Sequence, residues 1–139
     1  MEKKKYITED GVDEIIREKE DGVYALIGSH CECGFMNFPA GNFCIKCGSS
    51  NVKKSELSRK GTLYTWTKTM RPVNHMPAGN ITGYVDLEDG SRLISVIDVD
   101  EDDTPRIGAA VEMVFRPLWE EDGVPVIGYA AKQLKDGKL

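Results

Sequence analysis

The second half of the chain alternates between apolar and polar residues, which is the pattern of β-strands with one buried face. In residues 61–69 one face holds Leu63, Thr65 and Thr67, and the other holds Tyr64, Trp66 and Lys68. The same period of two recurs over residues 81–87, and further strands are predicted over residues 92–99, 110–117 and 126–134. The turn signal Glu88-Asp89-Gly90-Ser91 predicts a hairpin between the second and third segments.

These five predicted strands follow one another without a strong helical pattern between them. Short strands separated by turn signals favour a small closed barrel, and the OB-fold is the leading candidate. A β-sandwich is the alternative. The chain is therefore expected to be mainly β.

The segment 8–22 has the pattern of a short helix, which Thr8 or Asp10 would cap and Gly22 would end. Its apolar positions fall at spacings i, i+3 and i+4, and they are Val12, Ile15 and Ile16. This stripe is too narrow to form a core alone, so it must dock elsewhere. It either packs on the body of this chain or forms an arm that binds a partner. Residues 23–27 then predict a strand.

All four cysteines of the chain lie in two closely spaced pairs, Cys31 with Cys33 and Cys44 with Cys47. Thiolates are soft ligands, and two such pairs supply the four sulfurs of a closed tetrahedral Zn²⁺ site. The second pair is followed by Gly48, which allows the positive φ that a metal knuckle needs. The spacing predicts a rubredoxin-like ribbon with a structural zinc ion.

The first pair is one residue shorter than a standard knuckle, which leaves two hypotheses for the fourth ligand. Either a tighter turn brings both Cys31 and Cys33 to the metal, or His30 replaces Cys31. Four cysteines are favoured, because an unliganded thiol beside a metal site would be chemically hazardous.

Other uses of the cysteines are less favoured. The chain opens with Met1-Glu2-Lys3-Lys4-Lys5 and shows no apolar signal segment, which indicates a reducing cytoplasm and argues against disulfides. A thioredoxin-like redox pair would need a βαβ pattern that the sequence lacks. An iron centre is the remaining alternative, and its colour would reveal it.

Composition narrows the function further. Of 139 residues, 40% are hydrophobic and 29% are charged, and no apolar run approaches the ~20 residues of a membrane span. A soluble, cytoplasmic protein without a membrane partner is expected. Lys and Arg number 18 against 23 Asp and Glu, which gives a net charge of −5. This balance opposes nucleic-acid binding, whose affinity comes largely from cations that neutralise phosphates.

Aromatic residues lie between the two cysteine pairs, namely Phe35, Phe38 and Phe43, with Pro39 beside them. They are expected to form an apolar lid beside the metal, and stacking on a base is the less favoured hypothesis. The predicted organisation is then an N-terminal arm over residues 1–27, a zinc ribbon over 28–52 and a barrel over 53–139.

The order of these parts resembles the DUF35 family of zinc-ribbon OB-fold proteins. The resemblance covers nearly the whole chain, although the family usually spaces its first two cysteines by two residues. The matching pieces are Gly28-Ser29, Phe38-Pro39, Cys44-Ile45-Lys46-Cys47-Gly48-Ser49, Gly61-Thr62-Leu63-Tyr64-Thr65-Trp66, Gly83-Tyr84-Val85, Ile107-Gly108 and Val111-Glu112. The resemblance implies a noncatalytic partner of thiolase-like enzymes that helps to hold coenzyme A or an acyl-CoA.

The residues agree with a noncatalytic role. Thiolysis needs a nucleophilic thiolate, but the predicted metal site uses every cysteine. The sequence has only two histidines and no nucleophile-elbow pattern, so a free-standing hydrolase ranks last. A nucleic-acid-binding ribbon and barrel module is the second hypothesis.

The loop of residues 68–80 is the candidate site for coenzyme A or acyl-CoA. It joins the first two barrel strands, a position that OB-folds use for ligands, and it carries Lys68, Arg71 and His75 together with two methionines. These cations would meet the phosphates, while apolar walls would meet the pantetheine arm. The alternative is an exposed loop that only a partner subunit orders.

Overall fold

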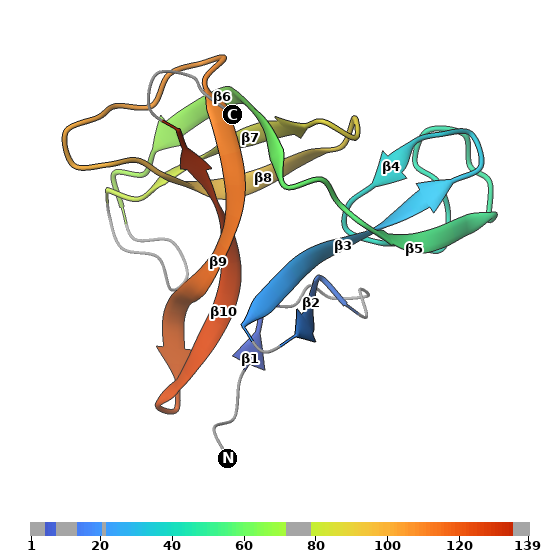
Figure 1. Ribbon diagram of the computed structural model, residues 1–139, viewed down its shortest axis with the longest axis horizontal. Helices are drawn as coiled ribbons and strands as arrows, with labels where there is room; N and C mark the ends of the chain where they lie inside the picture. The colour runs from blue at the N-terminus through green and yellow to red at the C-terminus, as the bar shows by residue number, and fades with distance from the viewer. Residues whose placement is uncertain (1–4, 8–13, 21, 72–78, 135–139) are drawn as a thin grey trace.

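The computed structural model describes residues 5–7, 14–20, 22–71 and 79–134, which form ten strands and no helix (Figure 1). The strands are β1 (Lys5–Tyr6), β2 (Ile16–Glu20), β3 (Val23–Cys31), β4 (Met36–Asn37), β5 (Val52–Glu56), β6 (Lys60–Lys68), β7 (Ile81–Leu87), β8 (Arg92–Asp98), β9 (Ala110–Glu121) and β10 (Val124–Gln133). Within these ranges, no helix has the length and apolar character that crossing a membrane requires.

The last five strands form a closed barrel, as predicted. Their order is β10-β8-β7-β6-β9, and β9 pairs with β10 to complete the circle. β8 and β10 run parallel over residues 96–98 and 130–132, whereas the other four pairings of the barrel are antiparallel. This is the arrangement of an OB-fold, so the sandwich alternative is wrong.

Along β7 and β8 the barrel interior follows the predicted period of two, and register shifts interrupt the β6–β7 and β9–β10 pairs. Leu63 faces Val85 across the β6–β7 pair, and they are 1% and 0% exposed. A β-bulge then shifts the register, so that Thr65 pairs with the exposed Tyr84. Leu63 and Thr65 were predicted to share one face, but after the bulge Thr65 lies on the outer face with Tyr84. At Gly83, a Cβ would lie 2.1 Å from the Thr65 carbonyl oxygen, which explains the glycine there.

The predicted N-terminal helix is wrong for its second half, because Ile16–Glu20 form strand β2. Val12 and the predicted caps Thr8 and Asp10 lie outside the described residues. Ile15 and Ile16 are both 6% exposed and belong to the same core cluster as Leu63, and β2 pairs antiparallel with β3. β-branched residues favour strands, and this pairing outweighs the weak helical spacing. In its described part, from residue 14 onward, the segment packs on the body of the chain.

Strand β3 is the common member of a four-stranded sheet with β2, β4 and β5. Its first half pairs with β2 and lies against the barrel, where the Tyr24 ring is 5.7 Å from the Phe115 ring. Its second half, residues 27–31, pairs with β5 and also with β4. Figure 1 shows β3 extending from the barrel side toward the cysteine-containing loops. One continuous strand thus joins the barrel to those loops.

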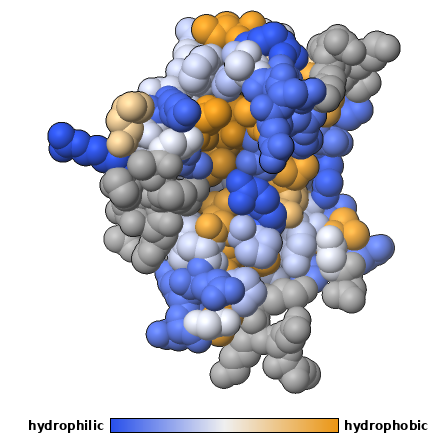
Figure 2. All heavy atoms as spheres, turned by 90° about the vertical axis from the view of Figure 1, so that its left-hand side faces the viewer, coloured by the Kyte–Doolittle hydropathy of each residue, from blue (hydrophilic) through white to orange (hydrophobic). Residues whose placement is uncertain are grey.

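The molecular surface mixes apolar and charged residues. On the face in Figure 2, apolar residues are visible in the middle, between hydrophilic residues on both sides.

The buried Gln133 on β10 anchors the acidic loop that follows β8. Its Nε2 donates to Asp103 Oδ2 at 3.0 Å and to the Thr104 carbonyl at 2.8 Å. The backbone N–H of Arg106 donates to Gln133 Oε1 at 2.9 Å.

The Asp103 carboxylate should make folding stability depend on pH. Hydrogen bonds from Gln133, from the Thr104 N–H and from Arg106 hold its pKa below the usual range. A depressed carboxyl pKa stabilises the fold above about pH 4, and this contribution is lost as the pH falls through the folded-state pKa. Asp103→Asn should therefore lower the melting temperature at pH 7, and the difference from wild type should shrink below pH 4. Thermal melts over this range, with Glu101→Gln as the exposed control, test it; a pH-independent difference would contradict it.

Candidate metal centre

Each cysteine pair lies on a tight turn that ends at a glycine. In the first turn the Gly34 N–H donates to the Cys31 carbonyl at 2.9 Å, and in the second the Gly48 N–H donates to the Cys44 carbonyl at 2.9 Å. Both glycines have positive φ, 96° and 78°. The hydrogen bond of the first turn joins residues three positions apart, and that of the second turn joins residues four positions apart. The first pair can therefore be one residue shorter, because its hydrogen-bonded ring is smaller. Cys33 therefore still turns back toward Cys31.

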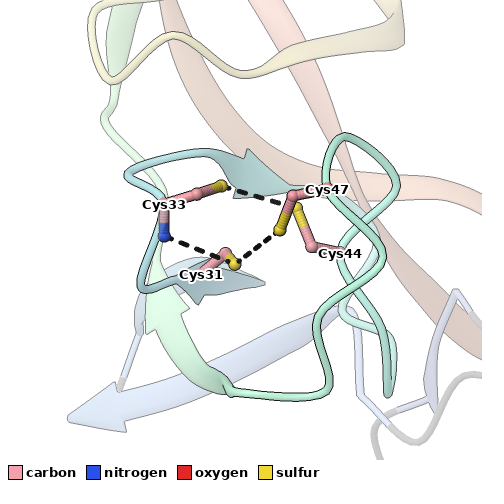
Figure 3. Close-up of side chains that lie close together, drawn as sticks. All are labelled: Cys31, Cys33, Cys44 and Cys47. Carbon is pink, nitrogen blue, oxygen red and sulfur yellow. Dashed lines mark hydrogen bonds between the residues drawn. The ribbon is translucent and has the colours of Figure 1, made fainter.

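The four sulfur atoms converge on one point (Figure 3). All of them lie within 4.8 Å of one another, with Cys31 Sγ 3.5 Å from Cys47 Sγ and Cys33 Sγ 3.8 Å from Cys44 Sγ. A tetrahedron with metal–sulfur bonds of ~2.3 Å has sulfur–sulfur edges of about 3.8 Å. The donor set and its spacing therefore fit a four-thiolate metal site.

The exposed His30 is not a member of this cluster. Its neighbour Cys31 is fully buried, and the Cys33 backbone N–H donates to the Cys31 sulfur at 3.5 Å. The geometry thus brings together the four residues that the spacing of the cysteines suggested. No disulfide joins them.

The surroundings treat the four thiols unequally. The Cys33 N–H lowers the pKa of Cys31, but burial and the adjacent thiols outweigh it and raise that pKa to about 12. Burial also opposes ionisation of Cys44, yet N–H groups of Cys47 and Lys46 and the side chain of Asn37 lower its pKa to about 6. Cys44 therefore ionises far more readily than Cys31, and the thiolate is the form that a metal ion binds.

Asn37 supports the second turn, a role that the sequence pattern does not reveal. Its side chain is 2% exposed, and its Oδ1 accepts from the Ile45 N–H at 3.0 Å while its Nδ2 donates to the Ser29 carbonyl at 3.4 Å. Gly28 makes room for this strand, since a Cβ there would lie 2.3 Å from the Asn37 carbonyl oxygen. The position of Asn37 between the two cysteine pairs was the one available signal.

The predicted aromatic lid does not form as a unit. The Phe38 ring packs edge-on against Tyr129 of the barrel, with the ring centres 5.8 Å apart. Phe43 is 63% exposed, and Phe35 is partly buried beneath the Lys46 ammonium group, 5.8 Å from the ring centre. Phe38 therefore joins the cysteine-containing loops to the barrel through its contact with Tyr129.

The candidate ligand loop is only partly described. Lys68 at the end of β6 and Arg71 are both exposed, whereas His75 lies outside the described residues. The base of the loop is closed by Thr69, whose N–H and Oγ1 both donate to the Asn80 carbonyl, at 2.8 and 3.0 Å. The two described cations thus stand at the start of a loop with a fixed base.

Comparisons with known proteins match both halves of this architecture. The family model described as the C-terminal OB-fold domain of ChsH2 matches residues 54–116. A DUF35 domain-containing scaffold protein of Pyrococcus furiosus is 34% identical over 114 residues, which cover 76% of this chain and 81% of that protein. The benzoylsuccinyl-CoA thiolase subunit BbsA of Geobacter metallireducens is 29% identical over 118 residues, which cover 84% of this chain and 80% of BbsA.

A solved structure shares the fold. The Ltp2-ChsH2(DUF35) aldolase superposes with a TM-score of 0.60 at 20% sequence identity, over 77% of this chain and 84% of the matched chain. The alignment therefore extends beyond the barrel alone.

Proposed function

Because the chain belongs to the family of DUF35 domain-containing scaffold proteins, we propose that it is a noncatalytic accessory subunit of a thiolase-like enzyme complex. The observation that carries this proposal is the alignment with BbsA, which spans 84% of this chain and 80% of a protein named as a thiolase subunit. The aldolase in the name of the structural neighbour also acts as part of an assembly with a DUF35 protein. The chain would dock on the catalytic subunit and help it to bind coenzyme A or acyl-CoA.

The metal centre has a structural role in this proposal. Cys31, Cys33, Cys44 and Cys47 would hold Zn²⁺ as thiolates, since four soft donors at these spacings suit zinc. When bound, the ion supplies a cross-link between the two turns. Four thiolates would leave no coordination position for water or substrate, so the site is not suited to metal catalysis.

The ligand site proposed for coenzyme A or acyl-CoA is the loop of Lys68, Arg71 and His75. The exposure of Lys68 and Arg71 leaves both cations accessible to phosphate groups, and the Thr69–Asn80 hydrogen bonds fix the base of the loop. Arg71 would bind a phosphate through its planar guanidinium group, while Lys68 would supply a point charge.

Substitutions in this loop should weaken ligand binding. In the assembled complex, Arg71→Ala and His75→Ala should each lower the affinity for acyl-CoA about tenfold, which is the usual loss for one charge-assisted hydrogen bond. Calorimetric titration measures this loss, with Lys53→Ala in β5 as a control that removes an exposed cation elsewhere. Unchanged affinity in both loop variants would remove this loop from the site.

The decisive test of the function is purification from native extract combined with metal analysis of the same sample. A stoichiometric thiolase-like protein and zinc should be recovered with the tagged chain. Benzoylsuccinyl-CoA and related aromatic acyl-CoA thioesters are the first substrates to assay, because BbsA is named for that substrate. Recovery of nucleic acid without an enzyme would instead favour the nucleic-acid module, which the net charge of −5 opposes.

A further inference from the structure

The outer face of β6, β7 and β8 carries large side chains that the chain itself does not cover. Tyr64 and Tyr84 are each 47% exposed, and Ile94 is 56% exposed. Tyr84 pairs directly with Ile94, while Tyr64 lies at the β6 bulge beside the residue that pairs with Tyr84. Directly paired residues in a sheet place their side chains on the same face, with Cβ atoms roughly 4.5–5.5 Å apart. We call Tyr64, Tyr84, Arg92 and Ile94 the barrel patch.

Arg92 holds this patch in one arrangement. Its guanidinium carbon lies 3.8 Å from the centre of the Tyr64 ring, and its Nε and Nη2 donate to the two carboxylate oxygens of Asp86 at 2.6 and 3.1 Å. The side chain therefore spans the three strands from β8 to β6. A surface that is ordered before binding loses little side-chain freedom when a partner docks.

The charge of the patch distinguishes between possible partners. Asp86 neutralises Arg92, so the patch offers phosphates no net positive charge, and the whole chain carries a net charge of −5. A nucleic-acid groove needs uncompensated cations between its aromatic side chains. Protein interfaces, in contrast, are enriched in Tyr and Arg and depleted of unpaired charge at their centre. These features favour a protein partner with a largely uncharged docking surface.

We propose that the barrel patch is the surface on which the thiolase-like catalytic subunit docks. This inference rests on the proposed function and adds the place of contact. The partner would present apolar side chains to Tyr84 and Ile94, and carbonyl or carboxylate oxygens to the N–H groups of Arg92 that Asp86 leaves unused. OB-folds in other proteins bind ligands on this same strand face, so a partner could bind here without a change in the shape of the barrel.

A second exposed apolar pair provides the matched control. Phe43 and Ile45 on the second cysteine turn are 63% and 81% exposed, more than any residue of the barrel patch. They lie outside the strand-paired face, and the arginines stacked on aromatic rings among the described residues lie over Tyr64 and Phe115 instead. If exposed apolar area alone decided docking, this pair would matter at least as much as the barrel patch.

The test uses the full-length chain and the thiolase-like subunit recovered with it from native extract, each then purified. Tyr84→Ala combined with Ile94→Ala should weaken the measured dissociation constant about thirtyfold or more, as truncation of an interface centre does. Phe43→Ala combined with Ile45→Ala should stay within about threefold of wild type. Unchanged melting temperature and zinc content in both variants would show that the fold is kept.

The outcomes separate the two proposals. If the wild-type chain forms no complex with a thiolase-like protein, both the function and this docking surface are overturned. If the complex forms and the barrel-patch variant binds like wild type, the docking surface alone is overturned. The docking surface is also overturned if the barrel-patch variant still binds the enzyme but loses a homodimer contact or the binding of a single-stranded oligonucleotide probe.

Discussion

Removing the metal should unfold the cysteine-containing ribbon, and the loss of one sulfur ligand should do the same. Structural zinc contributes about 10–16 kcal/mol to the folding of small zinc domains at neutral pH. Apart from the cysteines, the buried residues between β3 and β5 are Met36 and Asn37, while Phe43 and Ile45 are exposed, so these loops have little core of their own. In Cys31→Ser, the zinc content of the purified protein should fall from stoichiometric to near zero.

His30→Ala is the control for this result, because it removes the other candidate ligand of the first turn. His30 is exposed and outside the sulfur cluster, so this variant should keep its zinc and its melting curve. Zinc is measured by plasma emission spectrometry, and ribbon folding by amide exchange of residues 28–52. Full zinc occupancy in Cys31→Ser, or loss of zinc in His30→Ala, would contradict the assignment of the ligands.

Leu63→Ala should be the most damaging single truncation in the barrel. Leu63 is 1% exposed, faces Val85 across the sheet and belongs to the cluster that also includes Val111 and Met113. Shortening a fully buried leucine costs about 2–5 kcal/mol, through lost apolar transfer and the cavity left behind. For a domain of this size the melting temperature should fall by about 10 °C.

Its neighbour Thr62 supplies the comparison. Thr62 is exposed on the same strand, so Thr62→Ala should cost less than about 1 kcal/mol, the span of strand propensity. Chemical denaturation of both variants gives the two free energies of unfolding. Equal losses in the two would mean that the interior of the barrel does not carry its stability as the burial indicates.

The barrel could be predicted because its strands follow a simple rule. Alternation around Val85 and Leu87 and the turn at Gly90 each reflect local chemistry, and the structure places them accordingly. The bulge after Leu63 could not be foreseen, since it depends on how β6 meets Gly83 on the next strand. The alternation of residues before the bulge is the same whether or not the pairing shifts by one residue after it.

The N-terminal segment was mispredicted for a related reason. Ile15 and Ile16 fit one turn of helix and the start of a strand equally well, and only the neighbouring β3 decides between them. The cysteine cluster was predictable because ligand spacing is a local property. The supporting role of Phe38 was not, because it contacts Tyr129, which is distant in the sequence. That of Asn37 was not, because its hydrogen bonds to Ile45 and Ser29 depend on how the second turn folds beside β3.

The continuity of β3 has a consequence for assembly in the cell. One strand carries Cys31 at its end and, near its start, Tyr24, whose ring lies against Phe115 of the barrel, so the ribbon and the barrel are not independent modules. Loss of order at the cysteine end would loosen the β3–β5 pairing and the contact of Phe38 with Tyr129. In the proposed function, formation of the complex would then depend on zinc supply, because the scaffold would need its metal to keep these contacts.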